Sequence, residues 1–336
     1  DHRDLHSFPT RRSSDLSELP VAIIGAGPVG LAAAAHLVRR GLTPLVLEKG
    51  PSAGHAMRVW GHVSVFSPWR YNVDDAARAL LETTGWTAPD PETLPTGSEI
   101  VGRYLDPLAA HDDIAPHIVF GAEVHAIGRE GFDKVTTSQR ESAPFVLRYR
   151  DRLGQERRVH AQAVIDASGT WFSPNPMGID GMAVEGEQEA SNRIAYGIPN
   201  MLNGAGATYA GSRVLVVGSG HSAMNVVLDL LKLRETAPDT RIQWALRRNR
   251  VEKLLGGGLN DQLPARGDLG VAAMRAIDDG HVEVLVPFAA DRIERKNNHL
   301  EVAARIDGKA RQLDLDRIVV ATGFRPDIGM LRELRV

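Results

Sequence analysis

The chain has 336 residues and a mass of 36.5 kDa, which is enough for about two domains that each bury a hydrophobic core. Its 43% of hydrophobic and 24% of charged residues are typical of globular proteins, and the net charge of -3 gives no electrostatic reason to expect a nucleic-acid partner. The chain contains no cysteine, so these residues exclude disulfides, thiolate metal sites and thiol catalysis.

Residues 1–16 are expected to lie outside the folded protein, as an artefactual or disordered leader. Residues 7–16 resemble one reading frame of a common sequencing-adapter oligonucleotide, and a disordered polar leader is the alternative. No run approaches the roughly 18 uninterrupted apolar residues that span a bilayer, and no signal peptide opens the chain. We therefore expect a cytoplasmic protein with a small-molecule substrate and no membrane partner.

The first predicted elements are a strand, a glycine-rich turn and a helix. Residues 20–25 form a short apolar run, and Gly25, Gly27 and Gly30 then form the pattern G-x-G-x-x-G at the start of an alanine-rich helix over residues 29–40. Gly25 allows the tight turn, Gly27 lets the backbone approach a pyrophosphate, and Gly30 lets helix and strand pack closely. The pattern predicts that a pyrophosphate binds at the helix N-terminus.

A second predicted strand, residues 44–47, is followed by Glu48, 18 residues after Gly30 (48 minus 30). An acid at this place can accept both ribose hydroxyls of an adenosine, and its charge repels a 2′-phosphate. Strand, turn, helix, second strand and acid together predict a dinucleotide site. A glycine-rich turn in some other α/β protein is the alternative.

A second copy of this arrangement follows later in the chain. Residues 213–217 predict a strand and residues 224–233 a helix. The turn between them, with the pattern G-x-G-x-x-A, consists of Gly218, Ser219, Gly220, His221, Ser222 and Ala223. The next predicted strand, residues 241–246, leads into Arg247 and Arg248 instead of an acid, which suits the 2′-phosphate of NADP. A solvated pair of charges is the alternative.

Two more apolar strands end in small residues. Residues 163–166 run into the segment A-S-G-T, which contains Ala167 and Gly169, and residues 317–320 run into the segment A-T-G. Small residues at strand ends let the chain cross beside a bound cofactor. We call the glycine pattern at residues 25–30 the first fingerprint and the one at residues 218–223 the second. The segment A-S-G-T lies between the two fingerprints and the segment A-T-G follows the second. This order predicts that the second nucleotide domain is inserted after the sheet of the first.

These interleaved motifs resemble the flavoproteins with two dinucleotide-binding domains, which include the pyridine nucleotide-disulfide reductases and the flavin-containing and Baeyer–Villiger monooxygenases. The resemblance covers nearly all of residues 19–332, and residues 323–327 are similar to the family's segment that closes the NADPH domain. It implies FAD at the first fingerprint, NADPH at the second, and a contact between the backbone of Val124 and the adenine.

Carried over position by position, the resemblance implies two sets of cofactor contacts. Those in the FAD domain are Gly25, Gly27, Pro28, Gly30, Glu48, Lys49, Val124, Ala167 and Gly169. Those in the NADPH domain are Gly218, Ser219, Gly220, His221, Ser222, Ala223, Arg247, Arg248, Ala321 and Gly323.

The disulfide reductases of this family keep a redox cysteine pair either in the helix after the first fingerprint or in the NADPH domain. Both regions are present here without a cysteine, which excludes a dithiol relay. The monooxygenases need no protein nucleophile, because reduced flavin itself activates oxygen. Residues 103–105 and the strand predicted at residues 119–127 resemble that branch.

Monooxygenases of these types carry an F-x-G-x-x-x-H stretch before the second fingerprint, whereas residues 194–210 contain Tyr196 and Gly197 but no histidine. Three readings therefore stay open. We favour a monooxygenase-like enzyme that uses oxygen; the alternatives are an NAD(P)H:acceptor reductase or oxidase and a flavin-binding protein without catalysis. No catalytic residue is assigned, and no metal-ligand cluster is predicted.

Aromatic residues in the loop-like segment 60–71 are candidates for a cover on the substrate side of the flavin. They are Trp60, Trp69 and Tyr71, and simple packing at the domain edge is the alternative. His221 is expected either to contact NADPH phosphates or to cap its helix at the surface.

We therefore predict an α/β protein with two Rossmann-like three-layer domains, the NAD(P)H-binding domain being inserted in the FAD-binding domain. The predicted parts are an FAD-binding domain at 17–175, a mobile linker at 176–204 that helps to close the site, an NAD(P)H-binding domain at 205–327, and the start of a return to the FAD domain at 328–336. Because the FAD domain has to resume, we expect the natural protein to continue beyond Val336 by about 80 to 120 residues. The oligomeric state is not predicted.

Overall fold

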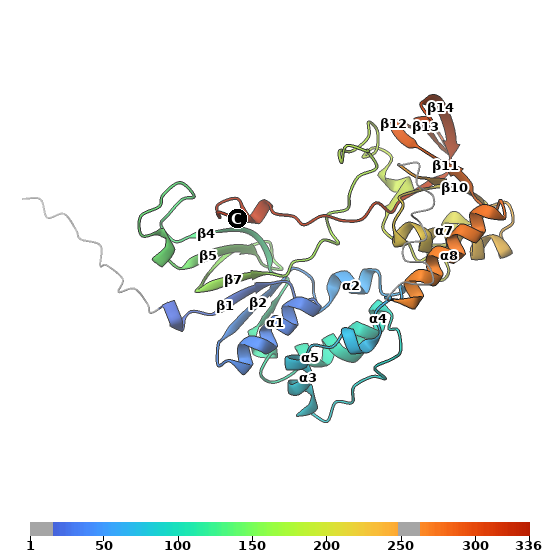
Figure 1. Ribbon diagram of the computed structural model, residues 1–336. Helices are drawn as coiled ribbons and strands as arrows, with labels where there is room; N and C mark the ends of the chain where they lie inside the picture. The colour runs from blue at the N-terminus through green and yellow to red at the C-terminus, as the bar shows by residue number, and fades with distance from the viewer. Residues whose placement is uncertain (1–15, 248–262) are drawn as a thin grey trace, which may run out of the picture.

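The structure, a computed structural model, describes residues 16–247 and 263–336. Figure 1 shows two α/β bodies that are joined by two extended segments. In each body, helices cover one face of a parallel sheet and a three-stranded antiparallel sheet covers the other. The predicted α/β class with two three-layer domains is thereby confirmed. Within the described residues, no helix is long and apolar enough to cross a membrane.

The first domain is built around a four-stranded parallel sheet with the strand order β3-β2-β1-β7. Its strands are β1 (Val21–Ile24), β2 (Pro44–Glu48), β3 (Ile118–Phe120) and β7 (Ala163–Asp166). Its helices are α1 (Pro28–Arg39), α2 (His55–Val59), α3 (Asp75–Glu82), α4 (Gly97–Ile100) and α5 (Asp106–Ala109). The antiparallel layer consists of β4 (Glu123–Arg129), β5 (Phe145–Arg150) and β6 (Glu156–Ala161).

Alternation of side chains along β1 explains these layers. Successive residues of a strand point to opposite faces of the sheet. Val21 and Ile23 pack with the helices, whereas Ala22 and Ile24 pack with the antiparallel layer. All four side chains are buried, which is why the strand is a continuous apolar run without a polar position.

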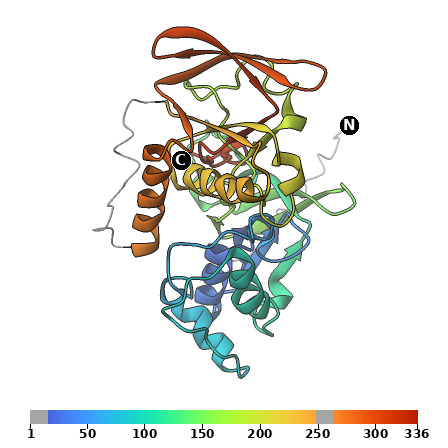
Figure 2. The same ribbon diagram turned by 90° about the vertical axis from the view of Figure 1, so that its right-hand side faces the viewer.

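The second domain repeats this plan around a five-stranded parallel sheet with the order β11-β10-β9-β15-β8. Its strands are β8 (Ile194–Tyr196), β9 (Arg213–Val217), β10 (Arg241–Ala245), β11 (Glu283–Leu285) and β15 (Arg317–Val320). The helices are α6 (Gly206–Tyr209), α7 (His221–Thr236) and α8 (Pro264–Asp278). The antiparallel sheet of β12 (Phe288–Arg295), β13 (Leu300–Ile306) and β14 (Lys309–Leu315) lies in Figure 2 at the top, on the side away from the first domain.

The strand predicted at residues 119–127 is wrong in one respect, because the structure has two strands there. Gly121 adopts a left-handed conformation with φ of +70° and ends β3, and β4 then begins in the other sheet. The hydrogen bond from the Ala122 N–H to the Glu48 carbonyl holds this change of sheet in place. Glycine adopts such a backbone conformation without steric cost.

The segment 176–204, which the sequence predicts to be a mobile linker, contains ordered structure that packs on the second domain. It supplies β8, the edge strand beside β15, and the buried side chains of Met177, Val184 and Ala190. Glu187 is only 1% exposed and accepts hydrogen bonds from the N–H groups of Met177 and Val184. We therefore correct this prediction: the buried acid ties the segment together, and its glycines and prolines do not make it a free linker.

The chain returns to the first domain at its end. Met330, Leu331 and Leu334 pack in the cluster that contains β4 and β5 residues, and Arg140 donates a hydrogen bond to the Glu333 carbonyl at 2.7 Å. The second domain is thus an insertion with two crossings. The domain boundaries given above stay predictions.

Candidate functional site

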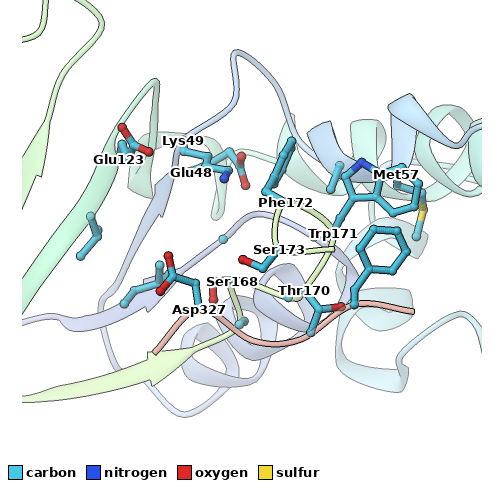
Figure 3. Close-up of a pocket in the computed structure, with 18 of the residues that line it drawn as sticks. Glu48, Lys49, Met57, Glu123, Ser168, Thr170, Trp171, Phe172, Ser173 and Asp327 are labelled. Atoms are coloured by element: carbon cyan, nitrogen blue, oxygen red, sulfur yellow. The ribbon is translucent and has the colours of Figure 1, made fainter. Parts of the chain in front are cut away.

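A cavity of about 1020 Å³ lies between the carboxyl ends of the first parallel sheet and the second domain (Figure 3). Sites at the carboxyl ends of parallel strands and at domain junctions are where nucleotide cofactors bind in α/β folds. The predicted cofactor residues that line the cavity are Gly25, Gly27, Pro28, Glu48, Lys49, Val124, Ala167, Gly169 and Ser222.

The three glycines of the first fingerprint differ in what surrounds them. A Cβ at Gly25, where φ is +100°, would lie 2.6 Å from the Ala167 carbonyl oxygen, and one at Gly30 would lie 1.9 Å from the carbonyl oxygen of Gly25. A Cβ at Gly27 would meet no atom within 4 Å. Packing of the protein therefore explains Gly25 and Gly30, whereas the open side of Gly27, which lines the cavity, leaves room for a ligand close to the backbone.

Helix α1 points its N-terminus at this cavity. Gly27 is the N-cap residue without a side-chain hydrogen bond, and Pro28 and Val29 of the first turn line the cavity. The first-turn N–H groups of a helix have no partner within the helix, and the helix dipole is positive at this end. The turn can therefore hold a pyrophosphate.

Glu48 is buried and positioned by two backbone donors. Its Oε2 accepts a hydrogen bond from the Ala26 N–H at 2.7 Å, and its Oε1 accepts one from the Gly50 N–H at 2.6 Å. Each carboxylate oxygen can accept a further hydrogen bond, and the side chain lines the cavity. This geometry fits the predicted pair of ribose hydroxyls.

The second fingerprint repeats the geometry of the first. A Cβ at Gly218, where φ is +139°, would lie 2.4 Å from the Ala321 carbonyl oxygen, and a Cβ at Gly220 would meet no atom within 4 Å. Gly220 is the N-cap of α7 without a side-chain hydrogen bond, and Ala223 is fully buried behind it. The second turn therefore has the same shape as the first, and such a turn can hold a phosphate.

The arginines predicted to bind a 2′-phosphate follow β10. Arg247 is exposed and donates a hydrogen bond to the Ile179 carbonyl at 3.3 Å, whereas Arg248 lies outside the described residues. The ring of His221 meets the ring of Phe66 edge-on, with centroids 5.3 Å apart, so the first domain contacts the start of α7. Ser219 is exposed in the turn, and Gly323 follows β15.

Aromatic side chains form one end of the cavity. The ring of Trp171 lies 6.3 Å from that of Trp60 and 4.6 Å from that of Phe324. A Cβ at Gly197 would lie 3.1 Å from atoms of both Trp171 and Phe324, so this glycine admits the two rings. Sequence reasoning missed Trp171, Phe172 and Phe324, although they directly follow the two small-residue strand ends, and that spacing is the signal that points to them.

Trp69 and Tyr71, which the sequence predicts on the substrate side of the flavin, lie away from the cavity. Trp69 is 2% exposed and packs in the core of the first domain, and Tyr71 is 65% exposed beside Arg70. Neither residue lines the cavity. Of the three, Trp60 alone lines it.

The pyridine nucleotide-disulphide oxidoreductase family matches residues 22–336. The chain belongs to this family. The family uses FAD and NADPH as cofactors, so the chain is an FAD-dependent NAD(P)H oxidoreductase. The open space at Gly27 and Gly220 and the positioned carboxylate of Glu48 fit two dinucleotides.

Curated relatives cover most of the chain at low identity. The ferredoxin–NADP reductase of Streptococcus gordonii is 23% identical over 324 residues, which are 94% of this chain and 78% of that protein. The ferredoxin–NADP reductase of Thermus thermophilus is 25% identical over 319 residues, which are 93% of this chain and 75% of that protein.

Two solved structures show the same fold. The bacillithiol disulfide reductase of Bacillus cereus has a TM-score of 0.68 at 20% identity, with 94% of this chain and 81% of that chain covered. The ornithine N-hydroxylase of Kutzneria sp. 744, with reduced FAD, NADP+ and L-ornithine, has a TM-score of 0.62 at 17% identity, with 93% and 83% covered. Reductases and hydroxylases thus share this fold.

Proposed function

We propose that NADPH at the second fingerprint reduces FAD in the cavity, and that the electrons pass to oxygen and a small-molecule substrate. The observation that carries this proposal is the absence of cysteine from all 336 residues, in a chain whose family includes disulfide reductases. Without a thiol pair in these residues, the two electrons have to leave the reduced flavin for an acceptor outside this chain.

The protein's own contribution is binding, orientation and shelter from water. The turn at Gly27 holds the FAD pyrophosphate, Glu48 orients the ribose, and the turn at Gly220 holds that of NADPH. Trp171 and Phe324 cover the end of the cavity where the domains meet. Bound flavin supplies the hydride and oxygen chemistry, and its outcome depends on how well the site excludes water.

A second candidate is an NADPH:acceptor reductase or oxidase that does not oxygenate a substrate. The similarity to two ferredoxin–NADP reductases over 93–94% of the chain favours it. The absence of a histidine from residues 194–210 favours it too, because the monooxygenases resembled here carry one in that stretch.

The two candidates differ in the fate of oxygen. The FAD-loaded protein is given NADPH in air, with and without the sulfide thioanisole, and NADPH, oxygen, peroxide and sulfoxide are each quantified. Our proposal predicts that one sulfide, one O2, one NADPH and one proton give one sulfoxide, one water and one NADP+, with little peroxide. Stoichiometric peroxide without sulfoxide, together with anaerobic NADPH oxidation by a quinone, would establish the reductase instead.

A further inference from the structure

The two domains are connected by two segments of the chain. Residues 170–176, which we name the first crossing, lead from β7 into the second domain, and residues 322–328, the second crossing, lead from β15 back to the first domain. Figure 1 shows both as extended segments between the two bodies. Domains of one chain move relative to each other unless their junction is held, so bonds between the crossings limit how far one domain can turn.

Asn175 bonds the first crossing to three residues of the second. Its N–H donates to the Gly323 carbonyl at 2.9 Å, and its carbonyl accepts a hydrogen bond from the Thr322 hydroxyl at 3.1 Å. Its side-chain Nδ2 donates to the Thr322 carbonyl at 3.1 Å, and its Oδ1 accepts from Nε of Arg325 at 2.8 Å. A bond from the Arg325 N–H to the Ser173 carbonyl at 2.9 Å extends this pairing, which we name the joint. An amide side chain donates and accepts at once, and alanine would supply neither side-chain bond.

The joint holds a pair of aromatic rings at the cavity. Trp171 of the first crossing and Phe324 of the second have ring centroids 4.6 Å apart, and both side chains line the cavity. An added Cβ at Gly197 of the second domain would lie 3.1 Å from atoms of both rings, so the pair packs closely against this glycine. The ring of Trp60 in the first domain lies 6.3 Å from that of Trp171. The ring pair therefore contacts both domains.

The domains also touch at a third place. The ring of Phe66 in the first domain meets that of His221 edge-on, with centroids 5.3 Å apart. His221 begins α7, which follows β9, whereas Gly197 follows the edge strand β8, so the two contacts lie at different strands of the second sheet. Contacts at the joint, at Gly197 and at His221 together define one orientation of the domains, because rotation about any one of them separates the others.

We propose that Asn175 is a positioning residue for the reduction of FAD by NADPH: it locks the joint, and the joint sets the angle between the domains at which the two cofactors meet. This inference rests on the proposed function, in which NADPH and a proton convert FAD to its two-electron reduced form and leave NADP+. The reacting atoms have to lie close and aligned, and a misplacement of about 1 Å lowers such a rate by as much as about a hundredfold.

Distances between the domains test the joint without any reaction. Because the chain contains no cysteine, Arg39→Cys in α1 and Glu235→Cys in α7, both at exposed positions, give two defined sites for nitroxide labels. Pulsed electron paramagnetic resonance then measures the distribution of label distances in the oxidised, FAD-loaded protein. We expect one narrow distribution in the labelled parent and a broader or shifted one after Asn175→Ala. An unchanged distribution in Asn175→Ala would overturn the joint.

The rate of flavin reduction tests the positioning role. In anaerobic rapid mixing, Asn175→Ala is expected to lower the rate constant at saturating NADPH by about tenfold or more, while FAD content and the dissociation constant of NADPH stay within about twofold. A merely structural role would lower FAD content or weaken NADPH binding instead. A parent-like rate constant, or a lowered one with an unchanged distance distribution, would contradict the proposal.

Two further variants control these measurements. Thr322→Val keeps the shape of the side chain and removes the hydroxyl bond to Asn175, so it should act in the same direction by a smaller factor; parent-like behaviour in both measurements would count against the joint. Asn297→Ala makes the same substitution in the exposed turn between β12 and β13 and should match the parent. Failure of NADPH to reduce the parent's flavin would contradict the proposed function, and the distance distributions would still decide whether Asn175 locks the joint.

Discussion

In the first fingerprint, Gly25 and Gly30 are required by the packing of the protein, whereas Gly27 leaves room for a ligand. Gly27→Val is expected to lose most of the bound FAD, because its methyl groups would occupy space that the protein leaves open for the cofactor. Gly102→Val is the control, since Gly102 is exposed, has no atom within 4 Å of an added Cβ and lies outside the cavity. Flavin absorbance per protein is the measurement. Equal flavin content in Gly27→Val and the parent chain would remove FAD from this turn.

Arg247 is expected to set a preference for NADPH over NADH. A charge-assisted hydrogen bond to the 2′-phosphate contributes about 1.5 to 3 kcal/mol, so Arg247→Ala should lower the ratio of the two kcat/KM values by about tenfold to a hundredfold. Arg241→Ala is the control, because Arg241 is exposed at the opposite end of the same strand. Steady-state kinetics with both coenzymes decide the matter, and an unchanged ratio in Arg247→Ala removes this arginine from the specificity.

At the scale of elements, an ion pair joins two neighbouring strands of the second sheet. Asp316 precedes β15 and accepts hydrogen bonds from the backbone N–H, Nε and Nη2 of Arg213 at 2.8, 3.1 and 3.0 Å. The Arg213 guanidinium and backbone N–H hold the pKa of the Asp316 carboxyl below its ordinary value. The lowered pKa adds stability above the pKa of the unfolded carboxyl, and this stability is lost as the pH falls through the folded pKa.

Asp316→Asn is therefore expected to lower the free energy of unfolding by about 1 to 2 kcal/mol near neutral pH, with a difference that shrinks as the pH falls below about 4. Denaturant titrations of the two proteins at several pH values measure this. Asp314→Asn, at an exposed neighbouring position, should show little change. A deficit in Asp316→Asn that stays constant down to low pH would contradict the role of its charge.

The elements that could be predicted from the sequence are those with strong local signals. The strands at residues 163–166, 213–217 and 317–320 have the predicted bounds, because each is a short apolar run closed by small residues. Of the antiparallel layers, only β4 is covered by a predicted strand, at residues 119–127. The sequence does not predict β5, β6 or β12–β14, since their mixed polar and apolar strands are selected by packing on the parallel sheets. Packing beside β15 likewise selects β8 at the edge of its sheet, and the sequence alone predicts only a linker there.

In the candidate site, too, some residues follow from local sequence patterns and others do not. The glycine turns and Glu48 follow from spacing, because backbone geometry alone determines what those positions do. Trp171 and Phe324 directly follow the two small-residue strand ends, but only the fold brings their rings together. The two crossings between the domains lie side by side there, joined by the Asn175 N–H that donates to the Gly323 carbonyl at 2.9 Å. Trp69 was predicted on the site but belongs to the core, since burial of a tryptophan leaves no local sequence signal.

At the scale of the whole molecule, the proposed function requires electron transfer between sites in two domains. In the proposed arrangement the first domain holds the FAD turn and the second holds the NADPH turn, and residues of both domains line one cavity. The contact between Phe66 and His221 brings the segment 60–71 of the first domain against the start of α7, the helix that follows the second glycine turn. Such an arrangement serves hydride transfer when the two rings meet there.

Anaerobic titration of the FAD-loaded protein with NADPH tests this claim most directly. One equivalent of NADPH per bound FAD should bleach the flavin absorbance completely, because a chain without cysteine has no second pair of electron acceptors. NADH should bleach it more slowly at the same concentration. Bound flavin that stays oxidised with both coenzymes, or that requires two equivalents of NADPH, would contradict the account.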